Sequence, residues 1–406
     1  MTGKIRTLLF STLYPSSVRP SHGIFVETRL RELLGSGEVE SRVVAPVPWF
    51  FSTNPRYGDY ALMARTPKHE VYQGIDVLHP RYLLPPKVGM TMAPLAIALT
   101  AMRSIRKLQR EGYGFDLIDA HYYYPDGVAA ALVARWLGKP YVITARGTDL
   151  NLIPEHALAR RMMLWAAQGA EASIGVCAAL MDVLKNWGLP PERLLVMRNG
   201  VDLKRFSPRP QTLARHELGL RGKPILLSVG HLVERKGNHV AIAALARLLP
   251  LYPEARLVLV GDGPERNNLQ ALAQRLGVAS SVQFAGPISN HQLASWYSAA
   301  DLLVLASSRE GWANVLLEAM ACGTPVVATR IWGTPEVVGN ATVGSLVDQR
   351  DPAHFAEAID TLLKASPNRA QVRAYAEDFS WQATSNAQLA LFRRIVSTRA
   401  SQGAAN

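Results

Sequence analysis

The chain has 406 residues, of which 48% are apolar and 19% charged, and its formal net charge is +12 at pH 7. A chain of this length exceeds what one hydrophobic core usually organises, so we expect a soluble globular protein with two domains of roughly 200 residues each. The positive charge favours an anionic surface or an anionic ligand as a partner.

The cysteine content and the lengths of the apolar runs indicate the expected cellular compartment. Cys177 and Cys322 stand far apart and in no metal-ligand spacing such as C-x-x-C, which argues against a disulfide framework and favours a reducing cytoplasm. The N-terminal MTGKIRTLLFST has too short an apolar run for a signal peptide. The longest uncharged stretch, residues 89–102, is shorter than the roughly 20 residues of a spanning helix. We therefore expect a cytoplasmic protein.

Short strand-like runs alternate with helical patterns along the chain. In the first half the expected strands lie within residues 5–12, 41–47, 116–122, 140–147 and 171–177, with helices around 24–35 and 126–137. In the second half the expected strands lie within residues 224–230, 256–263, 281–286, 301–308 and 324–330. Such alternation predicts an α/β fold of two doubly wound, Rossmann-like domains with parallel sheets and crossover helices.

A segment without apolar periodicity separates the two halves. Residues 198–210, RNGVDLKRFSPRP, contain glycine and proline and are the expected linker. Near the C-terminus, Ala387, Leu391 and Ile395 recur at four-residue spacing and predict a last amphipathic helix. The expected parts are thus an N-terminal domain, a C-terminal domain, a final helix and a flexible tail, over residues 1–198, 199–380, 381–399 and 400–406 respectively.

Residues 95–112, LAIALTAMRSIRKLQREG, combine basic and apolar side chains at helical spacing. The basic ones are Arg103, Arg106, Lys107 and Arg110. The apolar ones, on the opposite or adjacent face, are Leu95, Leu99, Met102 and Ile105. This pattern is typical of an ordinary surface helix packed on the sheet or, alternatively, of a basic face resting on anionic lipid near a lipid-linked acceptor. A nucleic-acid partner is not expected, because no recognition module or basic–aromatic array is present.

Two glutamates flank a predicted strand-to-helix turn in LLVLASSREGWANVLLEAMACGTPVVAT, residues 302–329. Glu310 is expected in the loop after the strand, and Glu318 within a helix that covers about residues 314–321. Because eight helical residues span about 12 Å, the pair does not fit the separation of about 5 Å between the carboxyls of a retaining glycosidase. The pair fits two separate binding contacts with an extended ligand at the carboxyl ends of parallel strands.

The start of this predicted helix adds an anion site. The amides of Trp312, Ala313 and Asn314 would open the helix and face anything anionic. The alternative for the two glutamates is a structural cap and a solvated helix residue.

A basic loop follows the strand PILLSVG. Arg235 and Lys236 are expected above the sheet, and Gly237 would allow close backbone approach. Arginine grips phosphate bidentately and lysine adds a point charge, so the loop predicts a phosphate site, with a solvated basic turn as the alternative. Together with the glutamate segment it indicates a negatively charged, hydroxyl-rich ligand.

Several segments resemble one enzyme family. VGHLVERKG, LVGDGPER, FAGPISNHQLASWYSAADLLVLAS and EGWANVLLEAMACGTPVVATRIWGTPEVV are similar to the retaining glycosyltransferases of family four, and Glu310 and Glu318 match the family's E-x7-E motif. The resemblance extends into the first half through HGIFV, DLIDAHYYYPDG, ARGTDLN and RNGVDLKRF. It implies the GT-B fold, in which two Rossmann-like domains face a central cleft and a C-terminal helix returns to the first domain.

The resemblance also implies roles for residues of the second half. Arg235 and Lys236 would bind the diphosphate of a nucleotide-sugar donor, and Glu318 the ribose of its nucleoside. Glu310, with the amides of residues 312–314, would hold the transferred sugar.

In the first half, the resemblance places Gly23 near the donor's phosphates, although many members have two glycines there. Arg146 stands where relatives often have histidine, so a basic group is retained in substrate binding. His121, at the end of the predicted strand DLIDA, would face the reacting sugar. A lone histidine at a strand end is otherwise a packed or capping residue.

These features predict a retaining glycosyltransferase that moves a hexose-type sugar from a nucleoside diphosphate donor to an acceptor hydroxyl, in the synthesis of a surface polysaccharide, a glycolipid or a related glycan. UDP is favoured over GDP on family grounds. The donor is a co-substrate, and no cofactor or bound metal is expected, because no Asp-x-Asp-like cluster is placed to hold a cation against phosphates. The acceptor is a glycan or a lipid-linked molecule, and the expected location is the cytoplasm, with a peripheral place at the inner face of the cell membrane as the alternative.

Two other functions stay open at this point. A GT-B nucleotide-sugar epimerase would need no acceptor, and a non-catalytic subunit would bind a sugar nucleotide or a glycan without turnover. A nicotinamide dehydrogenase is weaker, because Arg266 stands where the third glycine of G-x-G-x-x-G is required.

Overall fold

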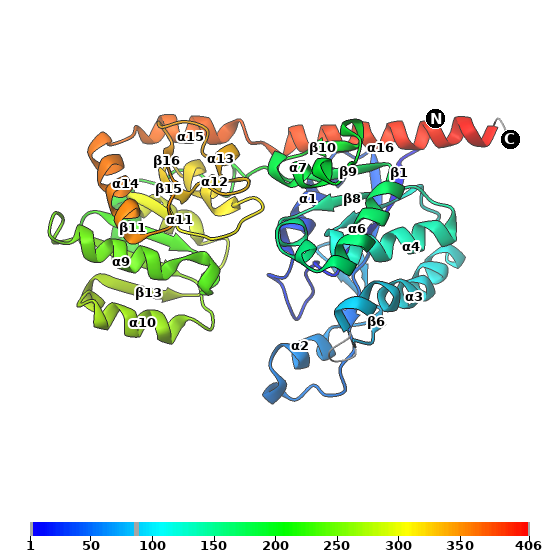
Figure 1. Ribbon diagram of the computed structural model, residues 1–406, viewed down its shortest axis with the longest axis horizontal. Helices are drawn as coiled ribbons and strands as arrows, with labels where there is room; N and C mark the ends of the chain where they lie inside the picture. Colours follow the sequence, from blue (N-terminus) through cyan, green and yellow to red (C-terminus); the bar gives the residue numbers. More distant parts are fainter. Residues whose placement is uncertain (1–2, 85–88, 405–406) are drawn as a thin grey trace. The chain divides into compact units, whose positions relative to one another are not determined.

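A computed structural model describes residues 3–84 and 89–404 (Figure 1). The chain divides into two compact units, the first formed by residues 1–198 with 382–406 and the second by residues 199–381. The division at residue 198 falls at the start of the expected linker. Both cysteines are buried, and they form no disulfide. None of the described helices is long and apolar enough to cross a membrane.

The first domain is built on an eight-stranded sheet of order β10-β9-β8-β7-β1-β2-β5-β4. Its strands are β1 (Ile5–Phe10), β2 (Val39–Val44), β4 (His69–Tyr72), β5 (Ile75–Leu78), β7 (Leu117–His121), β8 (Tyr141–Ala145), β9 (Ala172–Gly175) and β10 (Leu194–Val196). Two further short strands, β3 (Val47–Pro48) and β6 (Arg81–Tyr82), pair with each other. The predicted strands of the first half are therefore confirmed, and the central pairs β7–β1 and β1–β2 are parallel, as expected.

One edge of this sheet departs from the parallel arrangement, because β4 and β5, in a segment where the sequence predicted no strand, pair antiparallel. The turn between them has positive φ at both central residues, 50° at Gln73 and 81° at Gly74. That backbone belongs to the tight hairpin turn that reverses a strand in two residues.

Helices cover both faces of the first sheet. They are α1 (Ile24–Leu34), α2 (Asp59–Arg65), α3 (Gly89–Arg110), α4 (Val128–Leu137), α5 (Thr148–Asn151), α6 (Ala157–Gly169), α7 (Ala178–Asn186) and α16 (Trp381–Ala404). The helix α3 packs against α4, and α4 packs against α6. The four apolar residues expected on one face of α3 do not share it. Met102 and Ile105 are buried, whereas Leu95 and Leu99 are 40% and 54% exposed. These two leucines precede the exposed Arg103 at four-residue spacing and lie on its side of the helix.

The last helix, α16, completes the core of the first domain, which confirms the crossover helix. Leu389, Leu391, Phe392 and Ile395 pack with Leu117 of β7 and with apolar side chains of neighbouring strands. The helix continues to Ala404, beyond residue 399 where the sequence suggested a flexible tail, since no proline interrupts it. Residues 405–406 of that tail lie outside the described residues.

The second domain contains a six-stranded sheet of order β13-β12-β11-β14-β15-β16, and every pair in it is parallel. Its strands are β11 (Ile225–Val229), β12 (Arg256–Val260), β13 (Val282–Gly286), β14 (Leu302–Leu305), β15 (Val326–Thr329) and β16 (Gly344–Val347). Five of them lie where the sequence predicted strands.

Two layers of helices sandwich this sheet (Figure 1). One layer is α10 (Arg266–Arg275), α9 (Asn238–Leu248) and α14 (Pro352–Ala365). The other is α8 (Gln211–Glu217), α11 (Leu293–Ala299), α12 (Asn314–Ala321) and α15 (Arg369–Glu377). Near α12 the sequence-based bounds agree closely, because the helix covers the expected residues and β14 and β15 lie within the ranges expected for strands.

Candidate active site

In the second domain, the loops after β11 and β14 meet at the carboxyl edge of the sheet. Gly237 has a φ of 73°, and a Cβ added there would lie 1.8 Å from the carbonyl oxygen of Ala306. Only glycine allows the two backbones to come this close. The contact continues at Ser308, whose N–H donates to the carbonyl of Arg235 at 2.8 Å. The basic loop is thereby fixed against the segment that carries Glu310.

Lys236 and Glu310 form a buried ion pair at this junction. Lys236 Nζ lies 2.6 Å from Glu310 Oε1, and the two side chains are 16% and 9% exposed. The hydroxyl of Ser307 donates to the same carboxylate oxygen at 2.7 Å. Arg235 lies beside the pair, and its Nη1 reaches the carbonyl of Arg309 at 3.5 Å. The structure therefore brings three of the predicted residues together and adds Ser307, which sequence reasoning missed.

The segment between Glu310 and α12 carries the expected anion-binding amides, in part. The N–H groups of Trp312 and Ala313 donate no hydrogen bond to a described residue, whereas that of Asn314 donates to the carbonyl of Trp312 at 3.1 Å. The Trp312 side chain is 7% exposed and lies 6.1 Å from the ring of Phe379. Two of the three amides thus have no partner among the described residues, whereas that of Asn314 is bonded within its own loop.

Glu318 lies on the fifth residue of α12 and is held by a tyrosine. The hydroxyl of Tyr297, on α11, donates to Glu318 Oε2 at 2.7 Å. Burial raises the pKa of Glu318, and the Tyr297 hydrogen bond opposes that shift. The other carboxylate oxygen accepts no hydrogen bond from the residues that the structure describes, so it remains available to a ligand hydroxyl.

In the first domain, His121 ends β7 with both ring nitrogens engaged. Nε2 lies 3.2 Å from Asp119 Oδ2, and Nδ1 lies 2.5 Å from Nη2 of Arg146. Because the guanidinium can only donate, Nδ1 is the acceptor and Nε2 carries the proton. Burial lowers the pKa of His121 to about 4, although the Asp119 charge opposes the shift. The imidazole is neutral at physiological pH and 1% exposed.

Arg146 is placed by the turn that follows β8. Asp149 accepts from the N–H groups of Arg146, at 3.0 Å, and of Gly147, at 2.7 Å. It also accepts from the N–H of Tyr123 at 2.8 Å, which joins this turn to the chain after His121. The guanidinium of Arg146 lies over the ring of Phe25, 5.3 Å from its centroid. Arg146 thus contacts His121 directly. Arg146 stands where relatives often have histidine, and that difference alone did not predict this contact.

A chain of buried polar groups lies behind His121. Asp119 Oδ2 accepts from Gln388 of α16 at 2.8 Å, and Gln388 Oε1 accepts from Nε of Arg29 at 2.8 Å. All three residues are no more than 2% exposed. Asp119 and His121 lie on one face of β7, but the sequence analysis singled out only His121, and no signal in the sequence linked residues of α1 and α16 to it.

Gly23 caps the start of α1 with a φ of 69°. A Cβ there would lie 2.3 Å from the carbonyl carbon and oxygen of Leu13. The glycine therefore lets the first loop, residues 11–22, pass directly over the helix start. Among the described residues, no group of three or more His, Cys, Asp or Glu side chains could hold a metal ion.

Two family models match the chain and together span most of it. Residues 25–205 match Glycosyltransferase Family 4, and residues 211–379 match Glycosyl transferases group 1. A D-inositol 3-phosphate glycosyltransferase of Frankia alni is 34% identical over 71% of this chain and 76% of its own. TuaC of Bacillus subtilis, a glycosyltransferase assigned to teichuronic acid biosynthesis, is 31% identical over 87% of this chain and 88% of its own.

Solved structures share the fold. Sucrose-phosphate synthase of Thermosynechococcus elongatus superposes with a TM-score of 0.77 at 22% identity, over 97% of this chain and 100% of its own. HepE of Anabaena, solved with UDP, gives a TM-score of 0.69 at 21% identity, over 98% of this chain and 100% of its own. With the motif residues gathered in two Rossmann-like domains, the chain belongs to glycosyltransferase family 4 and has the GT-B fold.

Proposed function

We propose that this glycosyltransferase moves a hexose-type sugar from a nucleoside diphosphate donor to an acceptor hydroxyl with retention of configuration. The observation that carries the proposal is the buried Lys236–Glu310 pair beside the open amides of Trp312 and Ala313. This cluster offers cations and N–H groups to a diphosphate and a carboxylate to sugar hydroxyls. UDP is the favoured nucleotide, which the UDP and UDP-glucose complexes of HepE support by analogy.

The transfer breaks the bond between the anomeric carbon and the leaving phosphate oxygen. Arg235, Lys236 and the open amides stabilise the negative charge that develops on the diphosphate, so in this proposal the chain itself supplies that positive charge without a metal. The acceptor oxygen bonds to the same face of the sugar, and its proton passes to the leaving phosphate. No protein base is needed, which agrees with His121, whose nitrogens are both engaged.

Donor identity is tested by thermal unfolding with a panel of UDP- and GDP-sugars, because a ligand that binds the native state raises the unfolding temperature. Turnover is then followed by NMR with and without a glycan acceptor, since the product's anomeric coupling reports retention. A new sugar isomer from the donor alone would indicate an epimerase. Binding without product from any acceptor would contradict catalysis.

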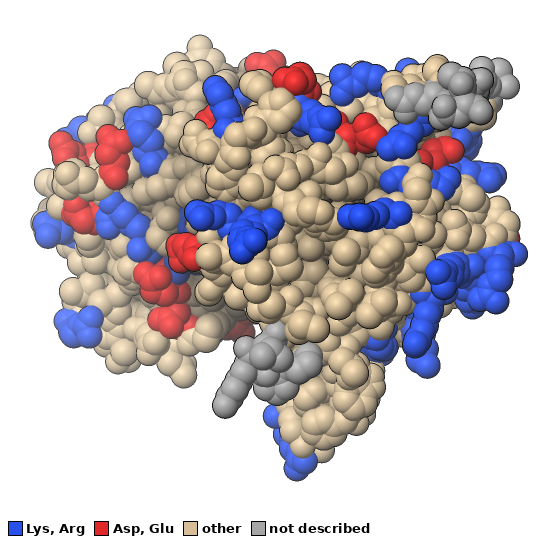
Figure 2. Space-filling view, turned by 45° about the vertical axis from the view of Figure 1, so that its right-hand side comes forward, with Lys and Arg blue, Asp and Glu red and all other residues tan. Residues whose placement is uncertain are grey.

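The acceptor, in this proposal, belongs to a surface polysaccharide, a glycolipid or a related glycan, and the enzyme works at an anionic membrane. Leu95 and Leu99 are exposed on α3 in line with Arg103, and the exposed Arg106 and Arg110 follow. Figure 2 shows basic side chains towards its lower right edge without acidic ones between them. Apolar side chains followed by arginines suit insertion among lipid tails and headgroups, with each charge contributing about 1 kcal/mol.

Sedimentation with vesicles tests the membrane proposal. The protein should sediment with anionic vesicles, and the triple variant R103Q/R106Q/R110Q should lose most of that binding. The charge-matched control, R135Q/R160Q/R161Q, changes exposed arginines elsewhere in the first domain and should keep it. Equal binding of the protein to neutral and anionic vesicles would exclude the proposal.

A further inference from the structure

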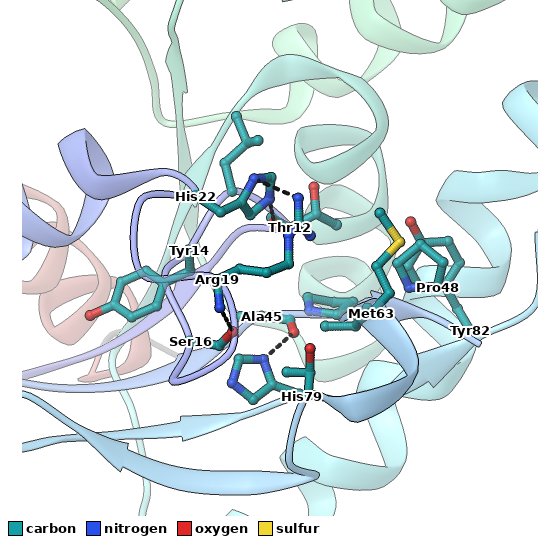
Figure 3. Close-up of a pocket in the computed structure, with 14 residues that line it drawn as sticks. Thr12, Tyr14, Ser16, Arg19, His22, Ala45, Pro48, Met63, His79 and Tyr82 are labelled. Carbon is teal, nitrogen blue, oxygen red and sulfur yellow. Dashed lines mark hydrogen bonds between the residues drawn. The ribbon is translucent and has the colours of Figure 1, made fainter. Parts of the chain in front are cut away.

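The first domain encloses a pocket of about 170 Å³ beside the first loop (Figure 3). Its walls come from the loop after β1, the chain after β2, the helix α2 and the strands that follow it. The polar lining side chains include Thr12, Ser16, Arg19, His22, His79 and Tyr82. A volume below the roughly 300 Å³ of drug-sized sites fits one small group of a larger ligand.

Arg19 is the cation of this pocket. Its Nη2 donates to Nδ1 of His22 at 2.9 Å, and Figure 3 shows the guanidinium beside that ring and near Thr12. No carboxylate of a described residue lies within 4.0 Å of it, and Asp59 acts on it only from farther away. One of the five guanidinium N–H bonds is therefore used within the described chain, and the others remain for a ligand.

The neighbouring groups fix Arg19 and do not neutralise it. His22 Nε2 lies 3.0 Å from the carbonyl of Thr12, so this nitrogen carries the ring proton and Nδ1 is the acceptor for Arg19. Glu70, on the outer strand β4, is the acidic side chain nearest to the lining residue His79 in the bonding network. Its carboxylate lies 2.9 Å from Nε2 of His79 and also accepts from the N–H of Ser17. On the inner side, Asp126 accepts from the hydroxyl of Thr12 at 2.9 Å.

Tyr82 adds an open hydroxyl. Its side chain is 6% exposed, and the hydroxyl makes no hydrogen bond with any described residue. The Tyr82 ring is buried, whereas its hydroxyl is not among the buried polar atoms that lack a partner, so water or a ligand can bond to it. Arginine and a tyrosine hydroxyl together match the oxygens of a phosphate or a carboxylate, which arginine binds through paired N–H groups.

The pocket is also connected to His121. The hydroxyl of Ser11, next to Thr12, donates to the carbonyl of His121 at 3.1 Å. We propose that this pocket binds a phosphate or carboxylate group of the acceptor, with Arg19 as the principal contact and Tyr82 as the second. The inference rests on the proposed function only in taking the ligand to be the acceptor.

Thermal unfolding and calorimetry with soluble probes test it. The anionic probes are D-inositol 3-phosphate for the phosphate arm and D-glucuronate for the carboxylate arm, and inositol and glucose are their neutral counterparts. The wild type should bind at least one anionic probe and neither neutral one. Arg19→Gln should weaken that binding at least tenfold, Arg19→Lys less, and Tyr82→Phe severalfold, while the control Arg135→Gln, an exposed arginine of α4, should leave it unchanged.

UDP provides an independent measure in the same variants. An unchanged UDP-induced shift in Arg19→Gln shows that the variant is folded and separates this pocket from the donor site. Absence of binding by both anionic probes at 10 mM, binding of neutral sugars with equal strength, or equal binding by Arg19→Gln and wild type would overturn the proposal. None of these results would affect donor binding, on which the proposed function depends.

Discussion

Gln388 donates a hydrogen bond of 2.8 Å to Oδ2 of Asp119, the same oxygen that lies 3.2 Å from Nε2 of His121. Gln388 and Asp119 are 269 positions apart in the chain. Arg29 holds the other end of the Gln388 amide, so its orientation is fixed with the nitrogen towards Asp119. The last helix of the chain therefore sets the carboxylate that orients the imidazole.

Gln388→Met should test this positioning role. The change leaves Arg29 Nε without its acceptor in a buried site, so we expect unfolding free energy to fall by about 1–3 kcal/mol. His121 should lose its fixed tautomer, visible as a change in its ring nitrogen NMR shifts, and turnover should fall while donor binding persists. Gln382→Met alters an exposed glutamine of the same helix and should change neither measurement. Unaltered His121 shifts in Gln388→Met would contradict the role.

Lys236→Ala and Glu310→Ala should each lower turnover by about 10²-fold or more, because removal of one preorganised charge from such a site commonly has this effect. The Lys236 variant should also bind UDP more weakly, since the diphosphate loses a cation. Lys364→Ala is the matched control, because its partner Asp360 forms an exposed pair on α14. Near-normal kcat in either site variant, measured by product formation, would show that the site is elsewhere.

Gly237→Ala should be much more harmful than Gly277→Ala. Both glycines have nearly the same φ, 73° and 72°, but a Cβ at Gly277 meets nothing within 4 Å, whereas at Gly237 it meets the carbonyl of Ala306. The first change should therefore add a backbone clash to a left-handed strain of about 1–2 kcal/mol that both share. Chemical denaturation measures the difference, and equal losses would mean that the loop contact is relaxed easily.

Asp126 should make the protein less stable as pH rises towards 8. Burial raises the pKa of Asp126 to about 8 from an ordinary value of 3.8. Between these values the native state holds a proton that the unfolded state has released, so stability declines with increasing pH, by at most about 1.4 kcal/mol per unit. Asp126→Asn should flatten this slope between pH 7 and 8, a range in which His121 contributes only a small slope of the opposite sign, because both its native and its unfolded pKa lie lower.

The sequence predicted the framework and the places of Glu310 and Glu318 in the second domain well, for reasons that are local. The strand–loop–helix around Glu310 follows from an apolar run, a glycine and a helical period, so the strand and the helix could be placed closely. Gly237 was identified as a point of close approach because few other residues allow one. These features depend on neighbours within a few positions along the chain.

The contacts that were missed depend on neighbours far along the chain. Tyr297 reaches Glu318 from another helix, and Gln388 reaches Asp119 from the chain's end. The hairpin β4–β5 was missed because Gln73 is an uncommon residue for its left-handed turn. Leu95 and Leu99 are exposed because another face of α3 packs against the domain. When apolar residues line two faces of a helix, their spacing alone does not show which face is buried.

The place of α16 has a consequence for the order of folding during synthesis. The core of the first domain contains Leu389, Phe392 and Ile395, which leave the ribosome after the whole of residues 199–381. The second domain, over residues 199–381, is complete earlier. Since domains generally fold as units, the domain translated second should finish folding first, and a nascent chain stalled before α16 should keep the first domain open to proteases.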